Sequence, residues 1–118
     1  MPREYKYSII KDDGWRFCLL PNNNNEQYVG ISCRYDDYNE VLSGLEKFKT
    51  YMSDKTVDTL DFTVEKLNLN GVRKNKYFAK FKFSNSEEFF TRRYAHRYEV
   101  KNGINRVVRN YNSNIRIN

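Results

Sequence analysis

One sequence pattern occurs twice in this chain, at positions 59 residues apart. The shared positions are 32–35 (Ser-Cys-Arg-Tyr), Val41 and Gly44 in the first copy, and 91–94 (Thr-Arg-Arg-Tyr), Val100 and Gly103 in the second. An internal repeat indicates two copies of one structural unit. In a chain of 118 residues, half of the chain would bury too little surface to be stable alone. We therefore expect a single domain, 1–118, in which a first repeat (1–59) and a second repeat (60–118) share one core.

The first repeat has the pattern of three strands, a helix and a short closing strand. Side chains alternate with the period of a strand over residues 5–10, 15–20 and 27–32. Asp12-Asp13-Gly14 predicts a tight turn between the first two strands. The helix is predicted from a capping pair, Asp37 and Glu40, and from an apolar stripe at helical spacing, Val41, Leu45, Phe48 and Met52. Residues 56–58 are predicted to form the closing strand.

The second repeat follows the same order. Strands are predicted at 61–67, 77–83 and 88–93, then a helix over 97–111 and a last strand at 114–117. The apolar stripe of this helix is Val100, Ile104, Val107 and Tyr111, each 59 positions after its counterpart. Because two such stripes need one common apolar surface, we expect both to be buried against one sheet.

Each predicted helix contains a glycine in its interior, Gly44 in the first and Gly103 in the second. Glycine inside a helix costs up to about 1 kcal/mol relative to alanine. The same unfavourable choice in both copies indicates a steric demand. We expect the helix backbone to approach the sheet closely at these two positions.

A further pattern runs through both copies: Tyr7, Trp15, Phe17, Ser32, Tyr35, Gly44 and Leu45 in the first and, more loosely, Phe62, Tyr77, Thr91, Tyr94, Gly103 and Ile104 in the second. With these residues the chain resembles the YegP-like family of short, often tandem, uncharacterised domains. The resemblance implies an α+β fold in which two tandem β-β-β-α-β repeats form one antiparallel sheet with both helices on one face. It also implies that the C-terminal strands are exchanged, so that 114–117 pairs with the first repeat and 56–58 with the second. Since both partners lie in one chain, we expect a monomer.

The residues that carry most catalytic chemistry are sparse. His96 is the only histidine, and Cys18 and Cys33 lack the spacing of a metal site or a disulfide framework. Adjacent carboxylates such as Glu87-Glu88 point to different sides of an element, so they predict turn and edge charges and no shared acid–base site. We therefore expect no enzymatic activity, no cofactor and no metal. The sequence also lacks a signal peptide and an apolar run of the length that spans a bilayer, and we expect a cytoplasmic protein without membrane contact.

The positive charge is concentrated in the second repeat. Residues 1–59 carry 8 Lys or Arg and 10 Asp or Glu, whereas residues 60–118 carry 13 and 5. A cationic sheet face with an exposed aromatic side chain can stack a base and neutralise phosphates, although a wet sheet face is also polar without any such function. The candidate binding residues are Arg16, Phe78, Lys80, Lys82, Arg92 and Arg93.

Two functions remain open at this point. The first is a small non-catalytic interaction module for an unknown protein or small ligand. The alternative is a weak single-stranded nucleic-acid binder that uses the basic second repeat. The alternative requires Lys80, Lys82 and Arg92 or Arg93 to form one contiguous patch, and an acidic residue dividing that patch would weaken it.

Overall fold

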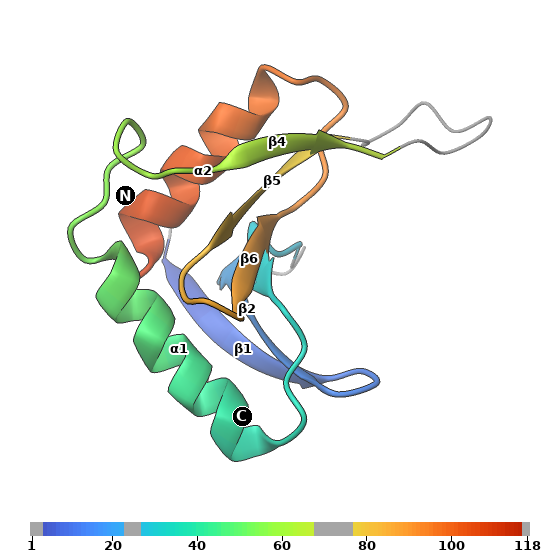
Figure 1. The fold of residues 1–118 in the computed structure, drawn as a ribbon, viewed down its shortest axis with the longest axis vertical. Coiled ribbons are helices and arrows are strands. Elements are labelled where there is room, and N and C mark those ends of the chain that lie inside the picture. Colours follow the sequence, from blue (N-terminus) through green and yellow to red (C-terminus); the bar gives the residue numbers. More distant parts are fainter. Residues whose placement is uncertain (1–3, 23–26, 68–76, 117–118) are drawn as a thin grey trace.

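The computed structural model describes residues 4–22, 27–67 and 77–116. Within these ranges the chain has an α+β fold with a six-stranded antiparallel sheet and two helices (Figure 1). The elements are β1 (Tyr5–Lys11), β2 (Trp15–Pro21), β3 (Gly30–Ser32), α1 (Tyr38–Met52), β4 (Thr63–Lys66), β5 (Tyr77–Lys82), β6 (Glu88–Thr91) and α2 (Glu99–Asn110). The strand order across the sheet is β1-β2-β3-β6-β5-β4.

The middle of the sheet joins the first half of the chain (residues 1–59) to the second half (60–118). There β3 pairs with β6 in antiparallel register, with Ile31 opposite Phe90. Backbone hydrogen bonds extend this pairing at both ends, from Cys33 N to Glu88 O at 2.9 Å and from Arg92 N to Val29 O at 3.1 Å. Each half therefore contributes three neighbouring strands, and the sheet is continuous across the chain.

Both predicted helical stripes are buried in one core, except for Tyr111 at the end of the second, which is half-buried. Val41, Leu45, Phe48, Val100, Ile104 and Val107 are each at most 1% exposed. They belong to the same cluster as Tyr7, Phe17, Leu19, Phe81 and Phe89 of the sheet. The ring of Phe48 stacks on that of Phe89, with the centroids 4.3 Å apart, so α1 of the first half packs on a strand of the second. Trp15 and Phe62 are half-buried and pack against this cluster.

Local signals at the ends of the elements are confirmed. The backbone N–H of Glu40 donates to Asp37 Oδ1 at 2.8 Å, which caps the start of α1. Asp13 and Gly14 both have positive φ, 52° and 116°, in the turn between β1 and β2. Aspartate and glycine tolerate this left-handed conformation, as tight hairpin turns require.

The two helix glycines have a steric cause. A Cβ on Gly44 would overlap the ring and hydroxyl of Tyr35, and a Cβ on Gly103 would overlap those of Tyr94. The close neighbour is in each case the side chain of a tyrosine that is bridged to a strand of the sheet, Tyr35 to Trp15 and Tyr94 to Tyr77. The expected steric demand is therefore present, and a tyrosine ring is what imposes it.

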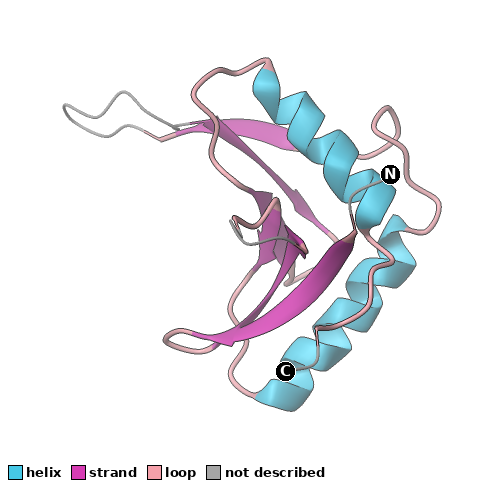
Figure 2. Ribbon diagram, turned by 180° about the vertical axis from the view of Figure 1, so that it is seen from behind, coloured by secondary structure: helices cyan, strands magenta, loops and turns pink. Residues whose placement is uncertain are grey.

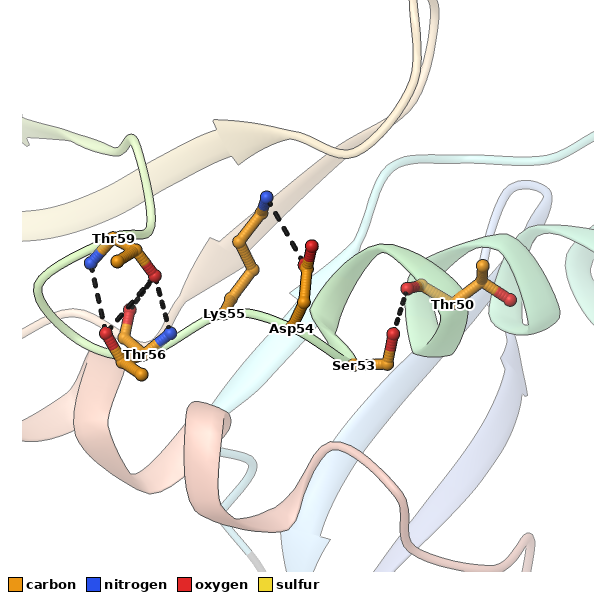
Figure 3. A network of polar contacts seen from close by, with 6 residues as sticks. All are labelled: Thr50, Ser53, Asp54, Lys55, Thr56 and Thr59. Carbon is orange, nitrogen blue, oxygen red and sulfur yellow. Dashed lines mark hydrogen bonds and ion pairs between the residues drawn. The ribbon is translucent and has the colours of Figure 1, made fainter.

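The predicted closing strand at 56–58 was wrong. Residues 57–59 form a turn, in which Thr56 N donates to Thr59 Oγ1 at 2.8 Å and Thr59 N to Thr56 Oγ1 at 3.2 Å (Figure 3). Leu60 N closes the turn on Thr56 O at 3.0 Å. Threonine hydroxyls that bond nearby backbone groups compete with a strand ladder, and here the local bonds prevail. This segment therefore supplies no exchanged strand to the second half.

The chain end behaves differently from residues 56–58. Ile115 forms a single parallel bridge with Tyr7 of β1. Tyr7 N donates to Asn114 O at 2.9 Å, and Arg116 N donates to Tyr7 O at 2.7 Å. The end of the second half thus pairs with the first half, as expected. The pairing is parallel and one bridge long, however, and residue 117 of the predicted strand lies outside the described residues.

Candidate functional site

One face of the sheet packs on the core, and the opposite face points away from it. Phe17, Ala79 and Phe89 are buried in the core. Their neighbours Arg16, Phe78 and Phe90 alternate with them and are only half-buried. Because successive side chains of a strand point to opposite faces, these neighbours belong to the face opposite the core, which we call the outer face.

A groove of about 370 Å³ lies on this outer face. It draws on both halves of the chain, and its lining includes Arg16, Ile31, Phe78, Phe90, Arg93 and Asp12. Three of the six candidate binding residues, Arg16, Phe78 and Arg93, therefore meet at one site. Its size is at the lower end of the range that is usual for small-molecule pockets.

The strand register fixes the order of residues along the groove. Its floor is the pair Ile31 and Phe90, which lie opposite one another where β3 meets β6. Phe78 on the neighbouring strand brings its ring centroid to 6.4 Å from that of Phe90, at an angle of 55°. Arg93 follows β6 at one end, and Arg16 lies on β2 at the other.

The other three candidates lie outside the lining of the groove. Lys80 pairs with Glu65 at 3.3 Å, and Lys82 stands opposite Glu88 in the register of β5 and β6. The guanidinium of Arg92 lies over the ring of Tyr94, 5.5 Å from its centroid. Acidic residues thus interrupt the positive charge on β5, so Lys80 and Lys82 do not form the uninterrupted cationic patch that the nucleic-acid hypothesis requires.

Sequence reasoning missed a buried polar cluster around Glu87. Tyr35 Oη donates to Glu87 Oε2 at 2.8 Å, while Lys47 Nζ and Ser84 Oγ each donate to Oε1 at 2.9 Å. Glu87 lies in the turn before β6, as predicted, but it is only 7% exposed, so its interpretation as an edge charge was wrong. A signal was present in the sequence, because Glu87 precedes the core residue Phe89 by two positions and so shares its face of the strand.

The protonation states in this cluster follow from burial and hydrogen bonding. Burial acts to raise the pKa of the Glu87 carboxyl, but hydrogen bonds from Lys47, Tyr35 and Ser84 outweigh it and hold the pKa below its ordinary value. Burial, together with the hydrogen bond to Glu87, raises the pKa of Tyr35. Glu87 is therefore an ionised acceptor and Tyr35 a protonated donor, which suits a fixed polar link better than acid–base exchange.

A hollow of about 300 Å³ lies beside this cluster, lined in part by Arg34, Ser43 and Lys47. The charged groups here already have partners. Arg34 pairs with Asp36 at 3.0 Å, and Lys47 pairs with Glu87 at 2.9 Å. The hollow thus offers a ligand fewer free charges than the groove on the outer face does.

Positions 59 apart share a further contact that the sequence pattern did not explain. Ser32 Oγ accepts from Phe17 N at 3.0 Å, and Thr91 Oγ1 accepts from Ala79 N at 2.8 Å. Each hydroxyl satisfies a buried backbone donor on the neighbouring strand, so a Ser or Thr is needed there. The match ends at the two tyrosines. Tyr35 is bonded to Glu87, whereas the buried Tyr94 Oη has no hydrogen-bond partner among the residues that the structure describes.

Metal-ligating groups do not gather in the part of the chain that the structure describes, where no three His, Cys, Asp or Glu side chains form a cluster. His96 is exposed near the start of α2, and its ring stacks on Tyr98 with the centroids 5.4 Å apart. Among the described residues, neither helix has the length and apolar character needed to cross a membrane.

Comparison of the chain with family models, with curated proteins and with solved structures found no match.

Proposed function

We propose that this protein is a small non-catalytic binding module and that the groove on the outer face of its sheet is the ligand site. The observation that carries the proposal is the joining of an apolar floor, Ile31 and Phe90, to the flanking cations Arg16 and Arg93. Pockets that combine apolar walls with a few oriented polar groups are the usual form of a ligand site.

The polar groups elsewhere support binding in preference to catalysis. Glu87 is held ionised by three donors, and Tyr35 is committed to it as a donor. His96 stacks on Tyr98 at the surface, and among the described residues no hydrogen bond joins its ring to a nucleophile. A general acid or base needs a partner within hydrogen-bond reach of a reacting group.

A second candidate function is the weak binding of single-stranded nucleic acid. It is favoured by the two aromatic rings, Phe78 and Phe90, beside Arg93, since bases stack on such rings and phosphates bind guanidinium groups. Glu65 and Glu88 oppose it, because they lie against Lys80 and Lys82, where a polyanion would have to continue.

We further propose that the chain is a monomeric, cytoplasmic tandem repeat of the YegP-like kind, with both helices on one face of the sheet. The matching contacts of Ser32 and Thr91, and those of Gly44 and Gly103 with their tyrosines, support a duplicated unit. Figure 2, in which both helices lie on the same side of the strands, supports the helix arrangement. Sedimentation velocity should give one species at the monomer mass, and a stable dimer would contradict the proposal.

The proposed site is tested by mapping amide chemical shifts in a ¹⁵N-labelled sample. A fragment mixture and a short oligo-dT are titrated separately. Fragment binding should shift the amides of Ile31, Phe78 and Phe90, and Phe78→Ala should weaken it. Lys101→Ala, an exposed change on α2, is the control and should leave binding unchanged. Shifts confined to other surfaces, or none with any fragment, would overturn the site. Saturable, salt-sensitive shifts with oligo-dT alone would favour the second function.

A further inference from the structure

Resting on the proposed function of the groove, we infer its ligand class: a small, flat, apolar molecule that carries one anionic group, placed at the Arg93 end. The inference depends on a difference between the two ends of the groove, on the shape of its floor, and on its size.

The two ends of the groove differ in free positive charge. At one end, Arg16 shares the lining with Asp12, and Arg16 Nη1 already donates to Ser32 O at 3.0 Å. At the other end, Arg93 is exposed and forms no ion pair with any described residue. An anionic group therefore gains more at Arg93, because near Arg16 the carboxylate of Asp12 would repel it.

The floor between the two ends favours a flat apolar body. Ile31 and Phe90 form its centre, and the Phe78 ring lies beside Phe90. Phe78 also lies close to the Arg93 end. Tyr77 forms an antiparallel bridge with Tyr94, so Phe78, which follows Tyr77, lies opposite Arg93, which precedes Tyr94. A ring that covers Phe78 and Phe90 thus brings a substituent on its edge within reach of the Arg93 guanidinium. A planar guanidinium group binds a carboxylate or a phosphate through two parallel N–H···O hydrogen bonds.

The size of the groove limits the ligand to a small molecule. Phe90 lies opposite Lys80 and Tyr94 is bridged to Tyr77, so Arg93 is level with Phe78, two strand positions or about 7 Å beyond Phe90. A volume of about 370 Å³ accommodates a two-ring body with one substituent over that length. Only one end offers an uncompensated cation, so a second anionic group would have no equivalent partner in the described part of the groove.

The inference is tested with pairs of probes that differ only in charge. 2-Naphthoate is compared with 2-naphthamide, and adenosine 5′-monophosphate with adenosine, by calorimetry at constant ionic strength. The carboxylate pair and the phosphate pair distinguish the two sources of the anionic group. We expect the charged member of at least one pair to bind about tenfold more tightly than its neutral partner, since tenfold corresponds to one good charge-assisted contact.

Substitution at Arg93 shows where that preference arises. Arg93→Gln should remove the preference and leave the affinity of the neutral probe unchanged, whereas Arg93→Lys should keep part of it. Arg109→Gln is the matched control, because Arg109 is an exposed arginine in the last turn of α2 and is not part of the groove lining. The ¹⁵N spectrum of each variant establishes that the fold is intact.

The outcomes separate the inference from the proposed function beneath it. Equal binding of charged and neutral probes at the groove, or a preference that survives Arg93→Gln, would overturn the ligand class and leave the groove as a binding site. The absence of saturable binding at Ile31, Phe78 and Phe90 for any of the four probes and for the fragments would overturn both.

Discussion

Tyr35 and Glu87 are 52 positions apart in the sequence, and the Tyr35 hydroxyl donates a buried hydrogen bond of 2.8 Å to the Glu87 carboxylate. One residue belongs to the first half of the chain and the other to the second. Lys47 on α1 bonds the second oxygen of the same carboxylate, so three segments meet at one charge. The Glu87 carboxylate therefore links the turn before β6 to α1 and to the segment that precedes α1.

Removal of the Glu87 side chain should destabilise the fold. Glu87→Ala leaves the buried Tyr35 hydroxyl without its acceptor, and a buried unsatisfied polar group costs about 1–3 kcal/mol. Glu87→Gln keeps one acceptor oxygen and should cost less. Glu46→Ala, at an exposed position on α1, serves as the control for urea unfolding. Equal midpoints for Glu87→Ala and wild type would show that the cluster contributes nothing to stability.

The Glu87 cluster should also make stability depend on pH. The pKa of Glu87 is lowered in the folded protein, so its ionised form contributes stability above the ordinary pKa of 4.5. That contribution is lost as the pH falls through the lower pKa of the folded state. As the pH is lowered from 5, the free energy of unfolding of the wild type should therefore decrease more than that of Glu87→Gln. Parallel pH profiles for the two proteins would be inconsistent with a lowered pKa.

Alanine at either helix glycine should be destabilising despite its better helix propensity. Alanine gains about 1 kcal/mol over glycine in a free helix. At Gly44 its Cβ would overlap the Tyr35 ring, and such overpacking costs about 1–3 kcal/mol. Gly44→Ala should lower the melting temperature in the wild type. The same change in a Tyr35→Ala background should raise it. A thermal double-mutant cycle measures both effects, and additivity of the two substitutions would exclude the tyrosine as the cause.

Truncation of the α2 stripe should be costly because its residues are enclosed. Ile104 is fully buried, and Ile104→Ala should cost about 2–5 kcal/mol. Lys101→Ala on the exposed side of the same helix should change stability by less than about 0.5 kcal/mol. Denaturant unfolding of both variants tests the burial, and a loss of under about 1 kcal/mol for Ile104→Ala would argue against it.

The sequence by itself determined the features whose cause is local. The spacing of Val100, Ile104 and Val107 was sufficient to predict a buried helical face, because the helix period depends only on neighbouring residues. Asp37 with Glu40 predicted the start of α1, and Asp13-Gly14 the turn after β1, since capping and positive φ are properties of a few adjacent residues. Alternation along β2 and β5 placed Arg16 and Phe78 on the outer face.

Tertiary structure decided the features that depend on residues distant in the sequence. The turn at 57–59 is an exception, because its cause is local. Thr56 and Thr59 are three residues apart, and each hydroxyl bonds the backbone N–H of the other, a signal that the sequence analysis missed. Period and composition do not reveal which strand will pair with which. Arg16, Phe78 and Arg93 lie along one groove only because β3 pairs with β6. Glu87 reaches its partners only because the turn before β6 lies against α1. Each of these contacts joins segments whose approach is set by the packing of the whole core, because a single hydrogen bond is too weak to bring distant parts of a chain together.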